Sequence, residues 1–264
     1  MDNINQEVLF ALGLTLLAGL STGIGSLIAF LAKRTNKKFL SCSLGLSAGV
    51  MIYVSFMELM PEATRQLSEM YSAKMAEIYM LIAFFGGIAF IAAIDLLIPE
   101  DENPHEFHSV EEANRKGLKR TGMMLALAIG IHNFPEGMAT FTTALANIDI
   151  AIPIAFAIAV HNIPEGIAVS VPIYQATQNR KKAFVLSFLS GMAEPVGAFL
   201  GYLFLAPMWS PTLNAAMLAI VSGIMIYISF DELLPSTEKF GHHHWGLVGV
   251  IFGFVLMAGS LLIL

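Results

Sequence analysis

Two near-identical stretches, His132-Asn-Phe-Pro-Glu-Gly137 and His161-Asn-Ile-Pro-Glu-Gly166, each lie near the middle of an apolar segment. In a helix, the four-residue spacing puts the histidine and the glutamate of each stretch on one face, one turn apart. The proline removes one backbone donor and crowds the carbonyl one turn earlier. We therefore expect each helix to kink there and to bare backbone oxygen beside the polar side chains.

The composition indicates a membrane protein. Of the 264 residues, 56% are hydrophobic and 13% are charged, and the mean hydropathy is +0.71, whereas about 25% of the residues of an average soluble domain are charged. No basic stripe suggests a nucleic-acid partner. The single cysteine, Cys42, excludes an intrachain disulfide and any CxxC motif. The first seven residues carry no Lys or Arg, so we expect the first apolar segment to be retained rather than cleaved as a signal peptide.

Eight apolar segments have about the 20 residues needed to cross roughly 30 Å of hydrocarbon. They predict an all-α integral membrane protein that forms a single domain over residues 1–264. The segments are 8–32, 41–62, 76–98, 121–145, 150–173, 183–206, 213–235 and 245–263. Twelve of the fourteen Lys and Arg residues fall in the loops after odd-numbered segments, including the loop 99–120. The positive-inside rule places these loops in the cytoplasm and both termini outside.

The chain also contains an inverted repeat. Segment 2 reads GVMIYVSFMELMP over 49–61, and segment 7 reads GIMIYISFDELLP over 223–235. Segments 1 and 6 match more weakly, with Gly19 and Gly25 aligned to Gly191 and Gly197. An offset of five segments is odd, so segments 1–3 and 6–8 cross in opposite directions, as do segments 4 and 5. This plan is typical of secondary transporters whose site lies at the midplane.

Several ionisable side chains share one depth near the middle of the membrane. They are His132, Glu136, His161, Glu165 and Glu194. Each would cost about 2.5–3.5 kcal/mol if it faced lipid, so we expect the five to face one another or water. An isolated residue of this kind is often a hydrogen-bonding contact between helices. Two aligned pairs and a third glutamate instead favour a site for one dication or two.

The donor set indicates which metals suit that site. Asn133 and Asn162 add amide oxygens, and Met51 in segment 2 is a candidate thioether ligand, although packing is the ordinary role of a membrane methionine. Imidazole, carboxylate and amide donors without thiolate favour Zn(II), Fe(II), Mn(II) or Co(II). The site therefore predicts binding of divalent transition metals.

Other acidic and histidine residues are weaker candidates. The inverted repeat places Glu58 near the outer face and its counterpart Glu232, next to Asp231, near the cytoplasmic face, where these residues would line an ion path. The third and seventh loops contain candidate cytoplasmic metal traps, for which solvated polar loops are the alternative. Their histidines are His105, His108, His242, His243 and His244.

The paired hexapeptides, the eight-segment layout and the Glu194 region resemble the ZIP family of divalent-metal transporters, over the whole chain. The resemblance implies uptake of zinc, and also of iron(II), manganese, cobalt and cadmium, across the bacterial cytoplasmic membrane. It implies a binuclear site: one ion held by His132, Glu136, His161 and Glu165 with Met51, and a second by Asn133, Asn162 and Glu194, with Glu136 and Glu165 bridging. It also implies a homodimer in lipid and no prosthetic group.

Alternating access is the mechanism that we hypothesise. Segments 1, 4, 5 and 6 would carry the metal and move against segments 2, 3, 7 and 8, and kinks at Pro135, Pro164 and Pro195 would leave backbone carbonyls available to help coordinate it. The competing class is an intramembrane metalloenzyme with a fixed di-metal site that activates water or oxygen. The His-Glu-x-x-His motif of metalloproteases is absent from the sequence, and inverted symmetry favours transport over catalysis.

Overall fold

Helices make up all the regular secondary structure in the residues that the computed structural model describes, which are 2–31, 37–97, 115–205, 210–239 and 241–263. The α-helices are α1 (Asp2–Leu31), α2 (Lys37–Val54), α3 (Met60–Ser68), α4 (Ala73–Leu97), α5 (Arg115–Ala146), α6 (Ile148–Thr177), α7 (Arg180–Gly191), α8 (Ala193–Leu205), α9 (Pro211–Ile228), α10 (Leu234–Lys239) and α11 (His243–Ile263). Two five-residue π-helices, η1 (Ser55–Leu59) and η4 (Ser229–Leu233), lie between α2 and α3 and between α9 and α10. The predicted all-α class is thus confirmed for the described residues.

Polar residues at the helix starts explain several boundaries. Asn147, Asn179 and Ser210 precede α6, α7 and α9, and each side-chain oxygen accepts a hydrogen bond from a backbone N–H two or three residues later, at 2.9 to 3.1 Å. Such N-caps satisfy donors that the first helical turn leaves free. Gln178 ends α6 in the left-handed conformation, with φ 52°. The capped turns at Asn147 and at Gln178–Asn179 join α5 to α6 and α6 to α7 directly.

Seven stretches of the described residues are long and apolar enough to cross a membrane. They are Gln6–Ile28, Lys37–Ser68, Ala73–Leu96, Ile148–Val171, Arg180–Phe204, Pro211–Glu238 and His243–Ser260. The remaining expected segment, 121–145, lies within α5, which packs along α6. Most of the loop 99–120, with His105 and His108, lies outside the described residues. The count of eight spans and the outward orientation of the termini stay predictions.

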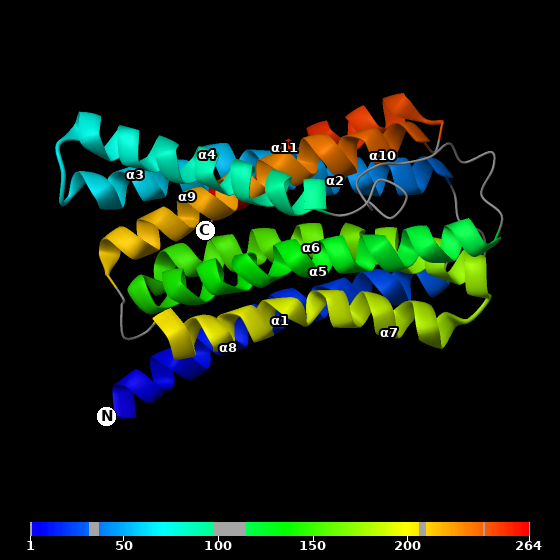
Figure 1. The fold of residues 1–264 in the computed structure, drawn as a ribbon, viewed down its shortest axis with the longest axis horizontal. Coiled ribbons are helices and arrows are strands. Elements are labelled where there is room, and N and C mark those ends of the chain that lie inside the picture. The colour runs from blue at the N-terminus through cyan, green and yellow to red at the C-terminus, as the bar shows by residue number, and fades with distance from the viewer. Residues whose placement is uncertain (1, 32–36, 98–114, 206–209, 240, 264) are drawn as a thin grey trace.

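The helices form two bundles that lie side by side along their length (Figure 1). Bundle A contains α1 and α5 to α8, and bundle B contains α2 to α4 and α9 to α11. Within bundle B, α2 packs on α11 and α4 packs on α9. The bundles meet mainly where α2 packs on α6, and less extensively where α5 packs on α9. Bundle A therefore corresponds to segments 1, 4, 5 and 6, and bundle B to segments 2, 3, 7 and 8.

Close backbone contacts at glycines follow the inverted repeat. A Cβ added to Gly25 in α1 would overlap the carbonyl of Ile163 in α6, and one added to Gly197 in α8 would overlap the carbonyl of Phe134 in α5. Ile163 and Phe134 hold the same position in the two hexapeptides. Small residues let membrane helices approach this closely. The packing of α1 on α6 is thus repeated by the packing of α8 on α5.

Helix irregularities also follow the repeat in bundle B, but not in bundle A. The π-helices η1 and η4 have the related sequences SFMEL and SFDEL and carry Glu58 and Glu232 at the same position. In bundle A, expected segment 6 is broken at Met192 into α7 and α8, within one turn of Pro195, whereas its counterpart, segment 1, lies in the continuous helix α1. The other related pair, α5 and α6, remains helical through Pro135 and Pro164.

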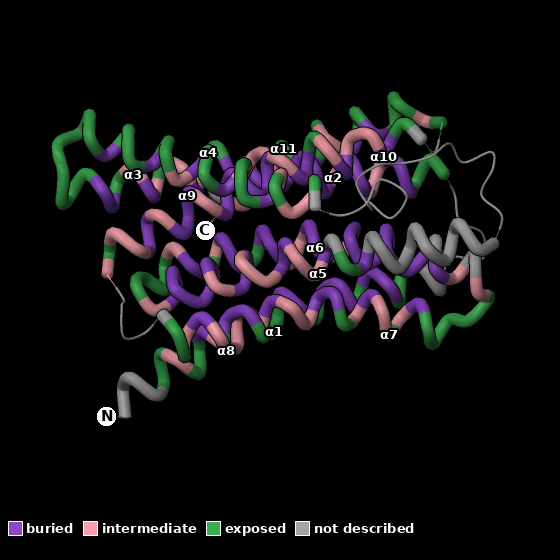
Figure 2. The backbone as a smooth tube through the Cα atoms, in the orientation of Figure 1, coloured by how far each residue is buried: buried purple, intermediate pink, exposed green. Residues whose placement is uncertain are grey.

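Buried residues lie on the inner faces of both bundles, and the outer turns of α4 and α11 are exposed (Figure 2). Only 22% of the apolar window of α4 and 28% of that of α11 is buried, compared with 78% for α6. Exposed apolar side chains such as Phe85 and Ile251 cover the outer faces. In a membrane protein these surfaces are solvated by lipid tails. The molecule therefore encloses α6 and presents α4 and α11 to the bilayer.

Candidate metal centre

The two hexapeptides lie side by side in α5 and α6, where the helices of both bundles meet. Their histidines, asparagines and glutamates are all buried, with exposures of 0 to 2%, and Glu194 at the start of α8 is fully buried as well. The fold thus brings together the polar residues that the sequence placed at one depth. They are His132, Asn133, Glu136, His161, Asn162, Glu165 and Glu194.

Each histidine contacts the glutamate of the other hexapeptide rather than its own. His132 Nε2 and Glu165 Oε1 form a hydrogen bond of 3.2 Å. His161 Nε2 and Glu136 Oε1 lie at the same distance, 3.2 Å, as an ion-pair contact without hydrogen-bond geometry. The two contacts are equivalent under the repeat. This crossed pairing joins α5 to α6 through the centre of bundle A.

The asparagines fix the neighbouring helices of bundle A. Asn162 Nδ2 donates to the carbonyl of Ala18 in α1 at 3.0 Å and also to the carboxylate of Glu194. Asn133 Nδ2 donates to the carbonyl of Ser190 in α7 at 3.3 Å. Both amide nitrogens donate to backbone carbonyls of neighbouring helices, so the two Oδ1 atoms remain available to accept hydrogen bonds or to bind a metal ion. The Ala18 and Ser190 carbonyls were not predicted from the sequence, although the aligned Gly19 and Gly191 beside them mark both positions.

Bundle B contributes Met51 near the same centre. Met51 is fully buried in α2 and contacts Ser47 Oγ at 4.0 Å through its sulfur. Ser47 Oγ in turn donates to the carbonyl of His161 at 3.4 Å. This pair of contacts places the Met51 thioether on the α2–α6 interface, next to the hexapeptide of α6.

Many polar atoms of the cluster have no hydrogen-bond partner among the described residues. They are His132 Nδ1, Asn133 Oδ1, both oxygens of Glu136, both ring nitrogens of His161, Asn162 Oδ1, Glu165 Oε2 and Glu194 Oε2. Buried polar atoms without a partner are rare and call for an explanation such as an ion or water. Most of these atoms are metal donors. In the described part of the chain, however, no three His, Cys, Asp or Glu side chains converge as a ready metal-binding group.

An acidic group on bundle B lies beside the cluster. Glu232 in η4 is 1% exposed, and its carboxylate is near enough to His132 and Glu165 for their charges to interact. Its charge also interacts with those of Asp231 and Asp95. The Tyr227 hydroxyl donates to Asp95 at 3.1 Å. Glu232 is therefore deeper than the helix-end position that the sequence argument gave it.

The other candidates lie apart from the cluster. Glu58 in η1 is half-buried and interacts with the charge of Glu62. His243 Nδ1 lies 3.1 Å from Glu238 Oε1, with both side chains exposed, and the His243 and His244 rings are in edge contact. His242 is half-buried beside them. These histidines form a surface group at the junction of α10 and α11.

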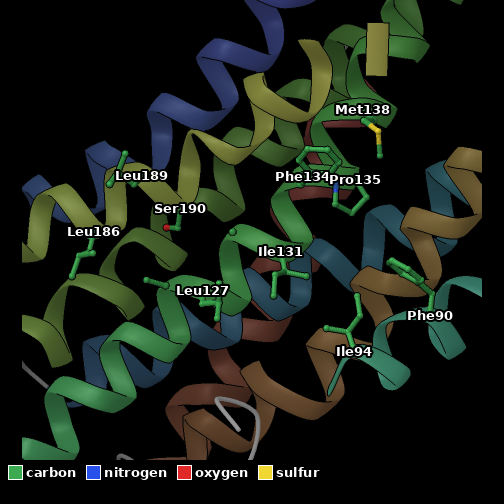
Figure 3. A pocket seen from close by; sticks show the side chains of 12 residues that line it. Phe90, Ile94, Leu127, Ile131, Phe134, Pro135, Met138, Leu186, Leu189 and Ser190 are labelled. Atoms are coloured by element: carbon green, nitrogen blue, oxygen red, sulfur yellow. The ribbon is translucent and has the colours of Figure 1, made fainter. Parts of the chain in front are cut away.

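An apolar groove of about 720 Å³ runs along the opposite face of α5 from the cluster. Figure 3 shows Ile131, Phe134, Pro135 and Met138 of α5 facing side chains of α4 and α7 across it. Its rim residues Phe90, Leu127 and Leu189 are 51 to 57% exposed, so the groove opens sideways. Because Ile131 and Phe134 flank His132 and Asn133 in sequence, one turn of α5 faces both the groove and the polar cluster.

Comparison with known proteins agrees with this architecture. The sequence profile of the ZIP zinc transporter family matches residues 97–261. A protein named Zinc transporter ZupT from Streptococcus mutans serotype c is 57% identical over 262 residues, covering 98% of this chain and 99% of the relative. Proteins of the same name from Clostridium perfringens and Akkermansia muciniphila are 55% and 52% identical, each with at least 98% of both chains covered. With its helical membrane spans and its paired hexapeptides, the chain belongs to the ZIP family of zinc transporters.

Proposed function

We propose that this protein takes up zinc, and also iron(II), manganese, cobalt and cadmium, across the bacterial cytoplasmic membrane into the cytoplasm. The buried, crossed histidine and glutamate pairs at the meeting point of two bundles are the observation that carries the proposal. The relatives are named as zinc transporters, so the metalloenzyme alternative finds no support in them. Metal ions are the cargo of this site.

The transported ions would bind where the cluster leaves donors unpaired. One ion would be held by His132, Glu136, His161 and Glu165 with Met51, and a second by Asn133, Asn162 and Glu194, with Glu136 and Glu165 bridging. Binding requires the crossed imidazole and carboxylate contacts to open, because the same atoms become metal ligands. Metal entry therefore exchanges contacts between α5 and α6 for metal bonds.

The movement we propose is alternating access of bundle A against bundle B, within a single eight-span domain whose termini face outward. The extensive α2–α6 interface and the smaller α5–α9 interface are the two surfaces that would slide. Glu58 would gather ions at the outer end, and Glu232, beside the cluster, and then Asp231 would receive them on the cytoplasmic side. A potential of 100 mV, negative inside, contributes about 2.3 kcal/mol per charge and thus roughly twice that for a dication.

Metal uptake into sealed proteoliposomes tests the proposal. The panel is Zn, Fe(II), Mn, Co, Cd and Mg, and wild type is compared with Glu136→Gln combined with Glu165→Gln. Glu77→Gln, an exposed carboxylate on α4, is the matched control. We expect transition-metal uptake to collapse in the double variant and to persist in the control. Tight metal retention without uptake by the wild type would refute transport.

A second experiment addresses the moving bundle. In a Cys42→Ala background, cysteine pairs across the α2–α6 interface are oxidised after reconstitution. We expect uptake to stop on oxidation and to return on reduction, whereas pairs within bundle B, between α2 and α11, leave uptake intact. Full uptake with α2 and α6 crosslinked would exclude relative motion at that interface.

The homodimer is proposed from the family resemblance. The outer faces of α4 and α11 have the smallest buried shares of the seven spans, and they are the apolar surfaces on which a second copy would pack. Sedimentation analysis of the detergent-solubilised protein distinguishes the dimer from a monomer.

A further inference from the structure

The polar contacts of the metal centre follow the inverted repeat from helix to helix. Asn162 donates to the carbonyl of Ala18 in α1, and Asn133 donates to the carbonyl of Ser190 in α7. Ala18 and Ser190 precede Gly19 and Gly191, which the repeat aligns and which contact each other closely. The two asparagines thus anchor equivalent carbonyls.

Glycine contacts extend the correspondence by one turn. A Cβ on Gly166 would overlap the carbonyl oxygen of Thr22, and a Cβ on Gly137 would overlap the carbonyl oxygen of Glu194. Gly166 and Gly137 are the last residues of the two hexapeptides. The backbones of Thr22 and Glu194 therefore hold equivalent places on α6 and α5.

Their side chains break the symmetry. The Glu194 carboxylate accepts a hydrogen bond from Asn162. Thr22 is 0% exposed, yet its Oγ1 has no hydrogen-bond partner among the residues described, and neither has Asn133 Oδ1. A buried hydroxyl normally bonds to protein or to ordered water. Both halves of the centre leave side-chain oxygens of asparagine or glutamate unmatched, but only the half that lacks a glutamate also leaves a hydroxyl donor, Thr22 Oγ1, unmatched.

We propose that the Thr22 hydroxyl is a further positioning group of the metal centre, holding a water molecule bound to the transported ion on the side opposite Glu194. The inference rests on the proposed function. A threonine reaches less far than a glutamate, and a water molecule spans the difference at little loss of bond strength. The close packing of Thr22 on Gly191, where an added Cβ would lie 2.7 Å from Oγ1, holds the hydroxyl in place.

A neutral group at this position suits transport. The centre has three carboxylates, Glu136, Glu165 and Glu194, for up to two dications. A fourth carboxylate in place of Thr22 would hold both ions more strongly in a medium of low dielectric constant, and would slow their release. The hydroxyl adds a contact without adding charge.

The test compares full-length wild type with Thr22→Val, which keeps the shape and removes the hydroxyl, and with Thr22→Ser, which restores it. Thr15→Val is the matched control, because Thr15 is equally buried in α1 but donates to its own helix at 2.9 Å. The readouts are the KM of zinc uptake into proteoliposomes and the zinc-induced rise in melting temperature.

We expect Thr22→Val to raise the KM about tenfold, the equivalent of about 1.4 kcal/mol, and to reduce the zinc-induced rise. Thr22→Ser should restore both values, and Thr15→Val should leave both unchanged. Should Thr22→Val fail to fold, Thr22→Ala compared with Thr22→Ser supplies the same contrast. A wild-type KM and a wild-type thermal shift without the hydroxyl would overturn the inference.

Failure of the proposed function would look different. In that case wild type itself would take up no zinc, or the double variant of Glu136 and Glu165 would transport as well as wild type. The thermal shift with zinc would still report whether Thr22 contributes to binding.

Discussion

At the scale of single residues, the crossed contacts are the feature that sequence spacing did not reveal. The four-residue spacing correctly puts histidine and glutamate of one hexapeptide on the same buried face. It says nothing about which side chain across the helix pair each one meets. His132 meets Glu165, and His161 meets Glu136, because α5 and α6 pack with their hexapeptides at the same level.

A double-mutant cycle tests the crossed pairing in the metal-free protein. His132→Ala and Glu165→Gln, which remove the two partners of a buried 3.2 Å hydrogen bond, should couple by about 0.5–3 kcal/mol in the free energy of unfolding. His132→Ala with Glu136→Gln should couple less, since that pair forms no such bond. Equal coupling in the two cycles would contradict the crossed arrangement.

The cluster residues could be named from the sequence for a physical reason. Seven polar residues lie at one depth in three membrane segments, and exposing them to lipid would be too costly. They must therefore face one another inside the protein. The Ala18 and Ser190 carbonyls and the Thr22 hydroxyl were not predicted, because backbone groups and a threonine carry little cost signal in a hydropathy pattern. The alignment of segments 1 and 6 is the signal that points to them.

At the scale of helices, close glycine contacts decide how α1 meets α6. Gly25→Ala should lower the melting temperature markedly, because the new Cβ would overlap the Ile163 carbonyl, which is backbone and does not yield easily. Gly13→Ala in the same helix is the control, since nothing lies within 4 Å of its added Cβ and alanine is the better helix former by about 1 kcal/mol. Similar thermal stability of the two variants would argue against this packing.

The π-helices give a second test at this scale. Such turns are often found at functional sites, and deletion of the exposed Phe56 removes the additional residue of η1 while restoring the α-helical register of α3. We expect the variant to fold and to bind zinc at the central cluster, but to transport it several times more slowly because Glu58 is reoriented. Deletion of exposed Met70, outside η1 in the turn before α4, is the control. Uptake at the wild-type rate after loss of Phe56 would exclude a role for η1.

The helix irregularities were predicted unevenly. Kinks were expected at Pro135, Pro164 and Pro195, and the helix of expected segment 6 is interrupted at Met192, within one turn of Pro195, whose missing N–H and ring disturb the preceding turn. The π-turns were not predicted, since a single wide turn leaves the apolar periodicity of SFMEL and SFDEL almost unchanged. Only their repetition at equivalent positions marked them as related.

At the scale of the whole molecule, the groove between α4, α5 and α7 separates the bundles on one side of the centre. Gly130→Phe places a large side chain there, because the added Cβ meets only Ser190 Cα at 3.8 Å. If bundle A moves against bundle B, filling the groove should reduce zinc uptake severalfold while the zinc-induced thermal shift remains. Gly86→Phe, on the exposed face of α4, is the control with open space around it. Unchanged uptake in Gly130→Phe would show that the groove does not change shape during transport.

The grouping of the segments into two bundles was part of the alternating-access hypothesis, and the contacts between helices match that grouping. The groove was not predicted, because its shape depends on how the side chains of α4, α5 and α7 pack, which the hydropathy pattern does not specify.

Because the groove opens sideways into the hydrocarbon, pressure in the surrounding membrane would affect the transport cycle. A cycle that opens and closes about 720 Å³ at hydrocarbon depth changes the volume of the protein, and hydrostatic pressure favours whichever state has less void. Compression of the bilayer would then favour the state with the closed groove and slow transport, although no metal ligand is changed.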